Sequence, residues 1–157
     1  THQDIQHMRA FTFRLETLLH HREMAKEKAI KEYAQSIAIR EKTEKQLMNA
    51  VKELKDLNSI IGEKRRVGFS GFEQETFNQS VLKAKEHIID LNSKVSDRKN
   101  IEEAKRKLFL EADTNCKSLL KLKDKKKEEH LKIEIKKEET ALEDVIGARF
   151  VFNQSTN

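Results

Sequence analysis

The sequence predicts an all-α fold in which two long helices form an antiparallel coiled-coil hairpin. The chain contains no proline and only four glycines, and its shares of charged and hydrophobic residues are nearly equal, at 38% and 36%. A compact globular core of this size needs more apolar volume and more turn residues. High charge with low hydropathy is also typical of disorder, but aliphatic residues recur here at helical intervals among good helix formers, which favours long helices.

One short segment concentrates the residues that interrupt helices. The sequence Val-Gly-Phe-Ser-Gly-Phe at residues 67–72 holds two glycines three residues apart, with a serine between them. Such chemistry marks the end of one helix and the start of the next. We therefore predict a helix over about 14–66, a turn over about 67–74, and a helix over about 75–148 followed by a short tail. At 1.5 Å per residue the first helix would be about 80 Å long, a length typical of coiled coils.

The first residues of the chain differ in character from the rest. His7-Met8 resembles a vector junction, and Met8 fits the start of a natural protein. We interpret residues 1–7 as a vector-derived leader and residues 8–157 as a single hairpin domain.

Heptad periodicity predicts which side of each helix faces the other. Alternating steps of three and four residues give the 3.5-residue period of a left-handed coiled coil. Both predicted seams contain a polar interruption near their middle. The seam of the first helix is predicted at Ile30, Tyr33, Ile37, Arg40, Glu44, Leu47, Val51, Leu54, Asn58 and Ile61, and that of the second at Val81, Ala84, Ile88, Leu91, Val95, Arg98, Glu102, Lys105, Phe109, Ala112, Cys116 and Leu119.

The polar interruptions predict the register of the hairpin. Antiparallel pairing about the turn opposes residues whose numbers add to about 142, and this sets Glu44 against Arg98. It also sets Arg40 against Glu102, so one register explains both interruptions. We interpret the charged layers as fixing the register, since no ligand-binding cluster accompanies them. The other layers in this register pair Ile61 with Val81, Leu54 with Ile88, Leu47 with Val95, Tyr33 with Phe109, and Ile30 with Ala112.

Apolar residues near the two termini have no predicted partner within the hairpin. The register places residues 15–19 near the charged segment 123–130, so either the register slips there or lysine stems cover the leucines. Beyond that segment a second apolar stripe extends past the start of the first helix. An apolar stripe without an internal partner favours an external one. The stripe comprises Leu131, Ile135, Leu142, Val145 and Ile146, followed by Phe150 and Phe152.

The sequence contains no motif for catalysis, cofactor binding or metal binding. A GxxxxGK[ST] phosphate loop is absent. His20 and His21 are adjacent, so a helix would point them about 100° apart, and we expect these and the isolated His87 and His130 to face solvent. A two-helix hairpin also leaves little room for a catalytic pocket. We therefore expect a protein that is not an enzyme and that has no catalytic residues, no cofactor and no metal site.

Charge and cysteine content narrow the partners and the compartment. The net charge of +5 arises from 32 basic and 27 acidic residues without a concentrated basic face, so we expect no nucleic-acid binding. Acidic protein surfaces and anionic lipid headgroups stay open as weak partners. The Lys123–Lys127 cluster alternates with carboxylates and reads as a solvated helix face. The single cysteine, Cys116, suits a core position in a reducing compartment, and no apolar run is long enough to span a bilayer, so we expect a cytosolic protein.

Two segments resemble a known family. Residues 11–22, Phe-Thr-Phe-Arg-Leu-Glu-Thr-Leu-Leu-His-His-Arg, resemble the opening of the FliJ family, small coiled-coil components of the bacterial flagellar type III export apparatus. Residues 141–150, Ala-Leu-Glu-Asp-Val-Ile-Gly-Ala-Arg-Phe, are similar to the acidic and aliphatic segment that the family carries near its C-terminus. Length, two helices and a central break agree over essentially the whole chain.

The resemblance implies a concrete role in protein export. FliJ-family proteins are similar to the central γ subunit of rotary ATP synthases, and they are thought to insert their paired termini into the hexameric export ATPase, FliI. They also bind the cytoplasmic domain of the export gate protein FlhA, promote export, and escort export chaperones. The implied location is the inner face of the cell membrane at the flagellar base, and the isolated protein is expected to be a monomer.

The resemblance also implies two sets of contact residues. The gate contact would lie near the turn, where Gln46, Ala50 and Phe77 are expected to be exposed, while the candidates in the second-helix seam have core packing as a competing interpretation. The ATPase contact would lie near the two termini. The gate candidates are Gln46, Ala50, Leu57, Phe77, Val81, Ala84 and Ile88, and the ATPase candidates are Phe11, Phe13, Leu15, Leu131, Ile135, Leu142, Ile146 and Arg149.

Two alternatives remain open from the sequence, and a third is disfavoured by the length of the turn. The equivalent stalk protein of a virulence-type secretion system is one, although the opening motif favours the flagellar system. A structural coiled coil that dimerises as a scaffold or tether is another, and it predicts a parallel dimer where the stalk predicts a monomeric hairpin. A rotary ATPase stalk proper would need an α/β domain between its helices, and the short turn leaves no room for one.

Overall fold

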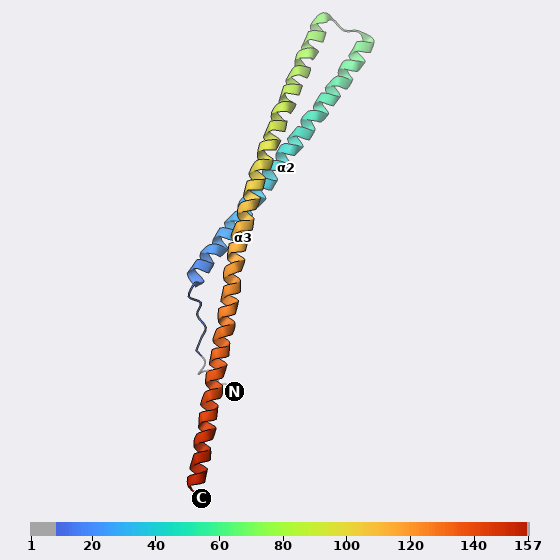
Figure 1. Ribbon diagram of the computed structural model, residues 1–157. Helices are drawn as coiled ribbons and strands as arrows, with labels where there is room; N and C mark the ends of the chain where they lie inside the picture. The colour runs from blue at the N-terminus through green and yellow to red at the C-terminus, as the bar shows by residue number, and fades with distance from the viewer. Residues whose placement is uncertain (1–8, 157) are drawn as a thin grey trace. The chain divides into compact units, whose positions relative to one another are not determined.

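The protein is an α-helical hairpin in the computed structural model, which describes residues 9–156 (Figure 1). Helix α2 spans Glu16–Val67 (52 residues) and helix α3 spans Gly71–Ser155 (85 residues). The two helices pack against each other, and no strand occurs within residues 9–156, so the predicted all-α hairpin is confirmed. The interpretation of residues 1–7 as a leader concerns residues outside the described range.

The end of α2 depends on the backbone conformation of Gly68. This glycine has a φ of +90°, in the left-handed region that favours glycine, and its N–H donates a hydrogen bond to the carbonyl oxygen of Lys64 (2.9 Å). A left-handed residue just past the last turn is a common way to satisfy the carbonyls that the helix leaves unpaired. The basic residues 64–66 lie in that last turn, where cations interact favourably with the helix dipole.

Helix α3 begins with a side-chain cap. The hydroxyl oxygen of Ser70 accepts a hydrogen bond from the backbone N–H of Glu73 (3.2 Å), so it replaces one of the partners that a first helical turn lacks. The rings of Phe69 and Phe77 meet edge to face at 5.9 Å across this start. The cap places the start of α3 at Gly71, earlier than the expected start near residue 75.

The turn gives a direct stability prediction. We expect Gly68→Ala to lower the free energy of unfolding by about 1 kcal/mol, because a Cβ is strained at positive φ. Gly62→Ala is the matched control, since Gly62 lies inside α2 and an added Cβ would meet no atom within 4 Å. It should raise stability by about 0.5–1 kcal/mol. Urea unfolding followed by circular dichroism measures both, and effects of the same sign would contradict this description of the turn.

The described chain divides into two compact units. The first comprises residues 26–112 and contains the turn, and its buried apolar residues include Ile61, Leu91 and Val95. The second comprises residues 9–25 and 113–156, and its most buried side chains are Leu19 (1% exposed) and Cys116 (2% exposed). The expectation that Cys116 is a core residue is thereby confirmed.

The seam of α3 follows the heptad prediction closely, and that of α2 follows it at alternate positions. On α3 each predicted position from Val81 to Leu119 is buried or half-buried, except Arg98, which is exposed. On α2, at every second predicted position, the preceding residue is the more buried of the two, and the predicted residues Ile30, Val51 and Asn58 are exposed. The predicted α2 positions that are buried or half-buried are Tyr33, Ile37, Arg40, Glu44, Leu47, Leu54 and Ile61. The buried or half-buried residues that lie one place before a predicted position are Ala29, Ser36, Thr43, Ala50 and Leu57.

Small side chains explain this shift on α2. Buried Ser36 and Thr43 fill alternate layers with little volume, and each hydroxyl donates a hydrogen bond to a backbone carbonyl of its own helix. The acceptors are the oxygens of Tyr33 (2.6 Å) and Ile39 (2.9 Å). Because these hydroxyls are satisfied locally, they can be buried at the helix contact without an unpaired polar group. At Ile30, Ile37 and Val51 the prediction followed the larger aliphatic neighbour instead.

The register is confirmed at two of its predicted layers. Arg40 forms a hydrogen-bonded ion pair with Glu102, and the rings of Tyr33 and Phe109 lie 6.1 Å apart. The numbers of each pair add to 142 as predicted.

The predicted pair of Glu44 with Arg98 is wrong. Glu44 accepts a hydrogen bond from Arg40 (2.9 Å) and lies 3.7 Å from the Lys99 ammonium. Because Thr43 occupies the seam, Glu44 is turned to its edge, where Lys99 rather than Arg98 is within reach.

Candidate functional site

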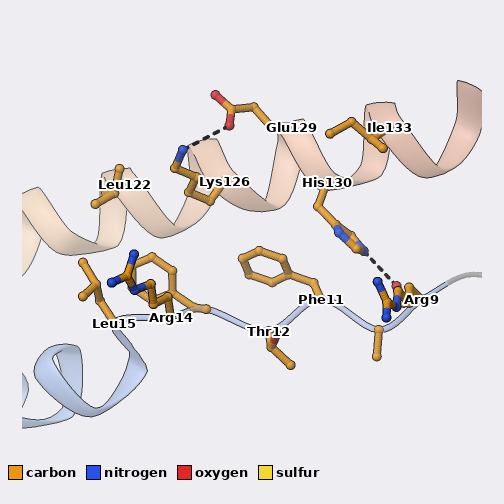
Figure 2. A pocket seen from close by; sticks show the side chains of 12 residues that line it. Arg9, Phe11, Thr12, Arg14, Leu15, Leu122, Lys126, Glu129, His130 and Ile133 are labelled. Atoms are coloured by element: carbon orange, nitrogen blue, oxygen red, sulfur yellow. Dashed lines mark hydrogen bonds and ion pairs between the residues drawn. The ribbon is translucent and has the colours of Figure 1, made fainter.

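A segment that precedes α2 lies along α3 in the unit formed by the two termini. Residues 9–15 run beside α3 from Leu122 to Ile133, and an open hollow of about 870 Å³ lies between them (Figure 2). Half-buried Phe11, Phe13 and Leu15 alternate with exposed Thr12 and Arg14. This alternation is expected of an extended chain, whose successive side chains point to opposite sides. Every second side chain of this segment, at Phe11, Phe13 and Leu15, therefore faces the charged part of α3.

His130 anchors this segment. Its ring centroid lies 5.7 Å from that of Phe11, and its Nε2 donates a hydrogen bond to the carbonyl oxygen of Arg9 (2.8 Å), as Figure 2 shows. The expectation that His130 faces solvent is wrong, since the residue is half-buried. Its position continues the α3 heptad seven residues after Lys123, and this spacing was the signal available in the sequence.

An ion pair locates where α2 begins relative to α3 in this unit. The Lys123 ammonium lies 2.9 Å from the Glu16 carboxylate, at the first residue of α2. Helix α3 continues from there through the 32 residues 124–155. The predicted stretch beyond the start of the first helix is therefore present, and it is longer than expected because α3 ends at Ser155 rather than near residue 148.

The distal part of α3 exposes the predicted apolar stripe. Every residue from 135 to 156 is exposed, and Leu131 is exposed as well. Leu142 and Ile146 expose 61% and 59% of their surface. We call residues 135–152 the distal face. The ATPase candidates thus divide into half-buried Phe11, Phe13 and Leu15, and exposed Leu131, Ile135, Leu142, Ile146 and Arg149.

The gate candidates all lie in the unit that contains the turn. Gln46 is exposed as expected, but Ala50 is only 6% exposed, so its expected exposure is wrong. It is buried because it occupies the α2 seam. Phe77 is half-buried against Phe69. The remaining candidates, Leu57, Val81, Ala84 and Ile88, are half-buried seam residues.

Two of the gate candidates line a shallow hollow that a partner could reach. Its volume is about 300 Å³, and Gln46 and Ala50 line it together with His87 of α3. The small side chain of Ala50 leaves room for it beside Leu91. His87 was not a predicted contact.

Within residues 9–156 no cluster of three or more histidine, cysteine or acidic side chains could hold a metal ion. No described helix contains a stretch apolar enough to cross a bilayer.

The fold defines a helical-hairpin protein. Its distal face and the hollow beside Gln46 are suited to contacts with other proteins. A profile of the flagellar FliJ protein family matches residues 11–155. Since the match covers almost the whole chain, the protein belongs to the FliJ family. Comparisons with curated proteins and with solved structures found no match.

Family membership assigns the general role. FliJ-family proteins are non-catalytic helical coiled-coil components connected with flagellar protein export. The resemblance predicted from residues 11–22 and 141–150 is confirmed by this family match.

Proposed function

We propose that the protein is a stalk-like component of the flagellar export apparatus, which binds the hexameric export ATPase through the distal face of α3. The observation that carries the proposal is the exposure of apolar side chains along α3 beyond the start of α2. Large exposed apolar surfaces favour partner binding. Its exposed apolar residues recur from Leu142 to Phe152, near the terminus where the resemblance implies the ATPase contact.

The sides on which these residues lie support insertion into a ring. Phe150, Val151 and Phe152 are all exposed by more than 60%, and consecutive helical residues point about 100° apart. Apolar side chains therefore project over a wide arc at the end of α3. A helix surrounded by the subunits of a ring has partners on several sides, whereas a helix on a flat surface uses one.

The gate contact is the second part of the proposal. We assign it to the hollow that Gln46 and His87 share, since Gln46 is the exposed gate candidate. Action at the export gate would place the protein at the inner face of the membrane at the flagellar base. We propose no particular surface for the escort of export chaperones.

Two variants and two partners test both contacts in one experiment. We expect Phe150→Asp to weaken binding to the purified export ATPase by at least about tenfold, because it buries a carboxylate in an apolar contact, and to leave gate binding unchanged. Gln46→Ala should weaken binding to the cytoplasmic domain of the gate and leave ATPase binding unchanged. Isothermal titration calorimetry of the full chain measures both affinities.

Ile89→Asp is the control for the aspartate substitution. Ile89 is 69% exposed on α3 and is not among the residues that line the proposed gate contact; it follows His87 by two residues, so it lies about 200° around the helix from it. It should change neither affinity. If Phe150→Asp bound the ATPase as tightly as the unaltered chain does, the assignment of the distal face would fail.

A further inference from the structure

The distal face carries a second heptad pattern, which no other described residue of the unit covers. Positions 135, 138, 142, 145, 149 and 152 follow each other in alternating steps of three and four, as in a coiled-coil seam. All six residues are exposed. Four of them are apolar, and the two interruptions carry opposite charges, at Glu138 and Arg149. A seam of this kind is suited to a second helix.

One antiparallel register matches this seam to itself. When residues of two copies pair so that their numbers add to 287, Glu138 of each copy faces Arg149 of the other. The remaining layers then contain only apolar side chains. A register shifted by one heptad sets Glu138 against Leu142 instead, and a parallel pairing sets each charge against its own kind, which is unfavourable. The apolar layers of the matching register pair Ile135 with Phe152 and Leu142 with Val145.

We propose that the distal face of one chain binds the distal face of a second copy in this antiparallel register. Ala141 and Ala148 flank the layers and are small enough to let the two helices approach closely. The two Glu138–Arg149 pairs fix direction and register. The seam has only six layers, so we expect weak association that depends on concentration. The seam between α2 and α3 is satisfied within one chain and does not require a second copy. The contact between copies comes from the distal face.

Self-association has a consequence for export that rests on the proposed function. A face covered by a second copy is closed to the ATPase, so free protein is stored with its apolar residues protected. Only one side of α3 takes part in self-association, and Phe150 lies outside the six layers. Phe150→Asp therefore separates the two activities, since it weakens ATPase binding and leaves self-association intact.

Sedimentation velocity of the full chain alone, over a wide range of concentration, tests the proposal. We expect the unaltered protein to shift from monomer to dimer as concentration rises. Glu138→Arg and Arg149→Glu should each raise the dissociation constant by at least about tenfold, because each places two pairs of like charges in the seam. The double variant Glu138→Arg/Arg149→Glu should restore the affinity of the unaltered chain.

Two controls test whether a change in dimerisation comes from the seam itself rather than from a general change of charge or a loss of folding. Glu143→Arg makes the same change of charge on the side of α3 away from the layers and should leave the dimer intact. All the altered residues are exposed, so circular dichroism should show an unchanged helix content. A chain that stays monomeric throughout would overturn the proposal, and so would single variants that dimerise like the unaltered chain, as a parallel pairing predicts. Neither result would bear on ATPase binding.

Discussion

Replacing Leu19 by alanine should lower the free energy of unfolding by about 2–5 kcal/mol. Leu19 is 1% exposed and is the largest fully buried side chain among the described residues. The loss combines the transfer free energy of the three carbon atoms removed with the cost of the void that remains. Urea unfolding of the full chain, followed by circular dichroism, measures the change. Hydrogen exchange should show the greatest loss of protection at the start of α2.

Leu18 provides the matched control. It has the same side chain, is the preceding residue of the same helix, and is 39% exposed. We expect Leu18→Ala to cost less than about 1 kcal/mol, since much of the side chain already contacts water. Equal losses of stability for the Leu18 and Leu19 variants would mean that the first turn of α2 does not face the core with Leu19.

Reversing the charge of Arg40 should lower the midpoint of thermal unfolding by an amount on the order of 5 °C. Arg40 bonds to the carboxylates of Glu102 and Glu44, and Glu41 lies 3.9 Å away. The hydrogen bond that Arg40 donates to Glu102 raises the pKa of the Arg40 guanidinium above its ordinary value, although partial burial acts in the opposite direction. Arg40→Glu would place a fourth carboxylate among three. Differential scanning calorimetry measures the midpoint.

The exchange of both charges tests whether the effect comes from the pair. Arg40→Glu/Glu102→Arg restores one opposite-charge pair across the two helices, so we expect it to recover a substantial part of the lost thermal stability. Lys94→Glu is the control, because Lys94 forms an exposed pair with Asp90 within α3. It should shift the midpoint by no more than about 1 °C. No recovery in the double variant would show that Arg40 acts through something other than Glu102.

The pairing of the two helices was predictable because it depends on periodicity. On α3 large aliphatic residues mark the seam, and the burial of Leu91 and Val95 follows from their spacing. The charges of Arg40 and Glu102 then fix which layers meet. Both signals are carried by side-chain type and number alone, so no knowledge of local geometry is needed.

The seam of α2 could be predicted only in part, because two neighbouring positions compete for the same layer. Val51 is more apolar than Ala50, yet Ala50 is the buried one. The choice depends on how closely the helices approach, and small residues permit a closer approach. The distance between the helices is a property of the pair, so the sequence of one helix alone does not give it.

The candidate site was predictable where it is helical and was missed where it is not. The exposed distal face follows from the sequence, because α3 continues beyond the start of α2. The packing of residues 9–15 could not be predicted, because only Phe11, Phe13 and Leu15 indicate the alternation of this short extended segment. The contact of His130 with Arg9 is made to a backbone oxygen, which carries no signal of residue type.

The short turn at Gly68 also determines the order in which the hairpin folds. Contacts lie farther apart in sequence with distance from the turn: 62 residues separate Arg40 from Glu102, and 121 separate Arg9 from His130. Closing a long loop first costs more chain entropy than extending a hairpin that has already formed. We therefore expect pairing to spread from the turn towards the termini, with refolding slowed more by substitutions near Ile61 than near Leu19. The segment that covers His130 is then the last part of the chain to pack and the first to be released.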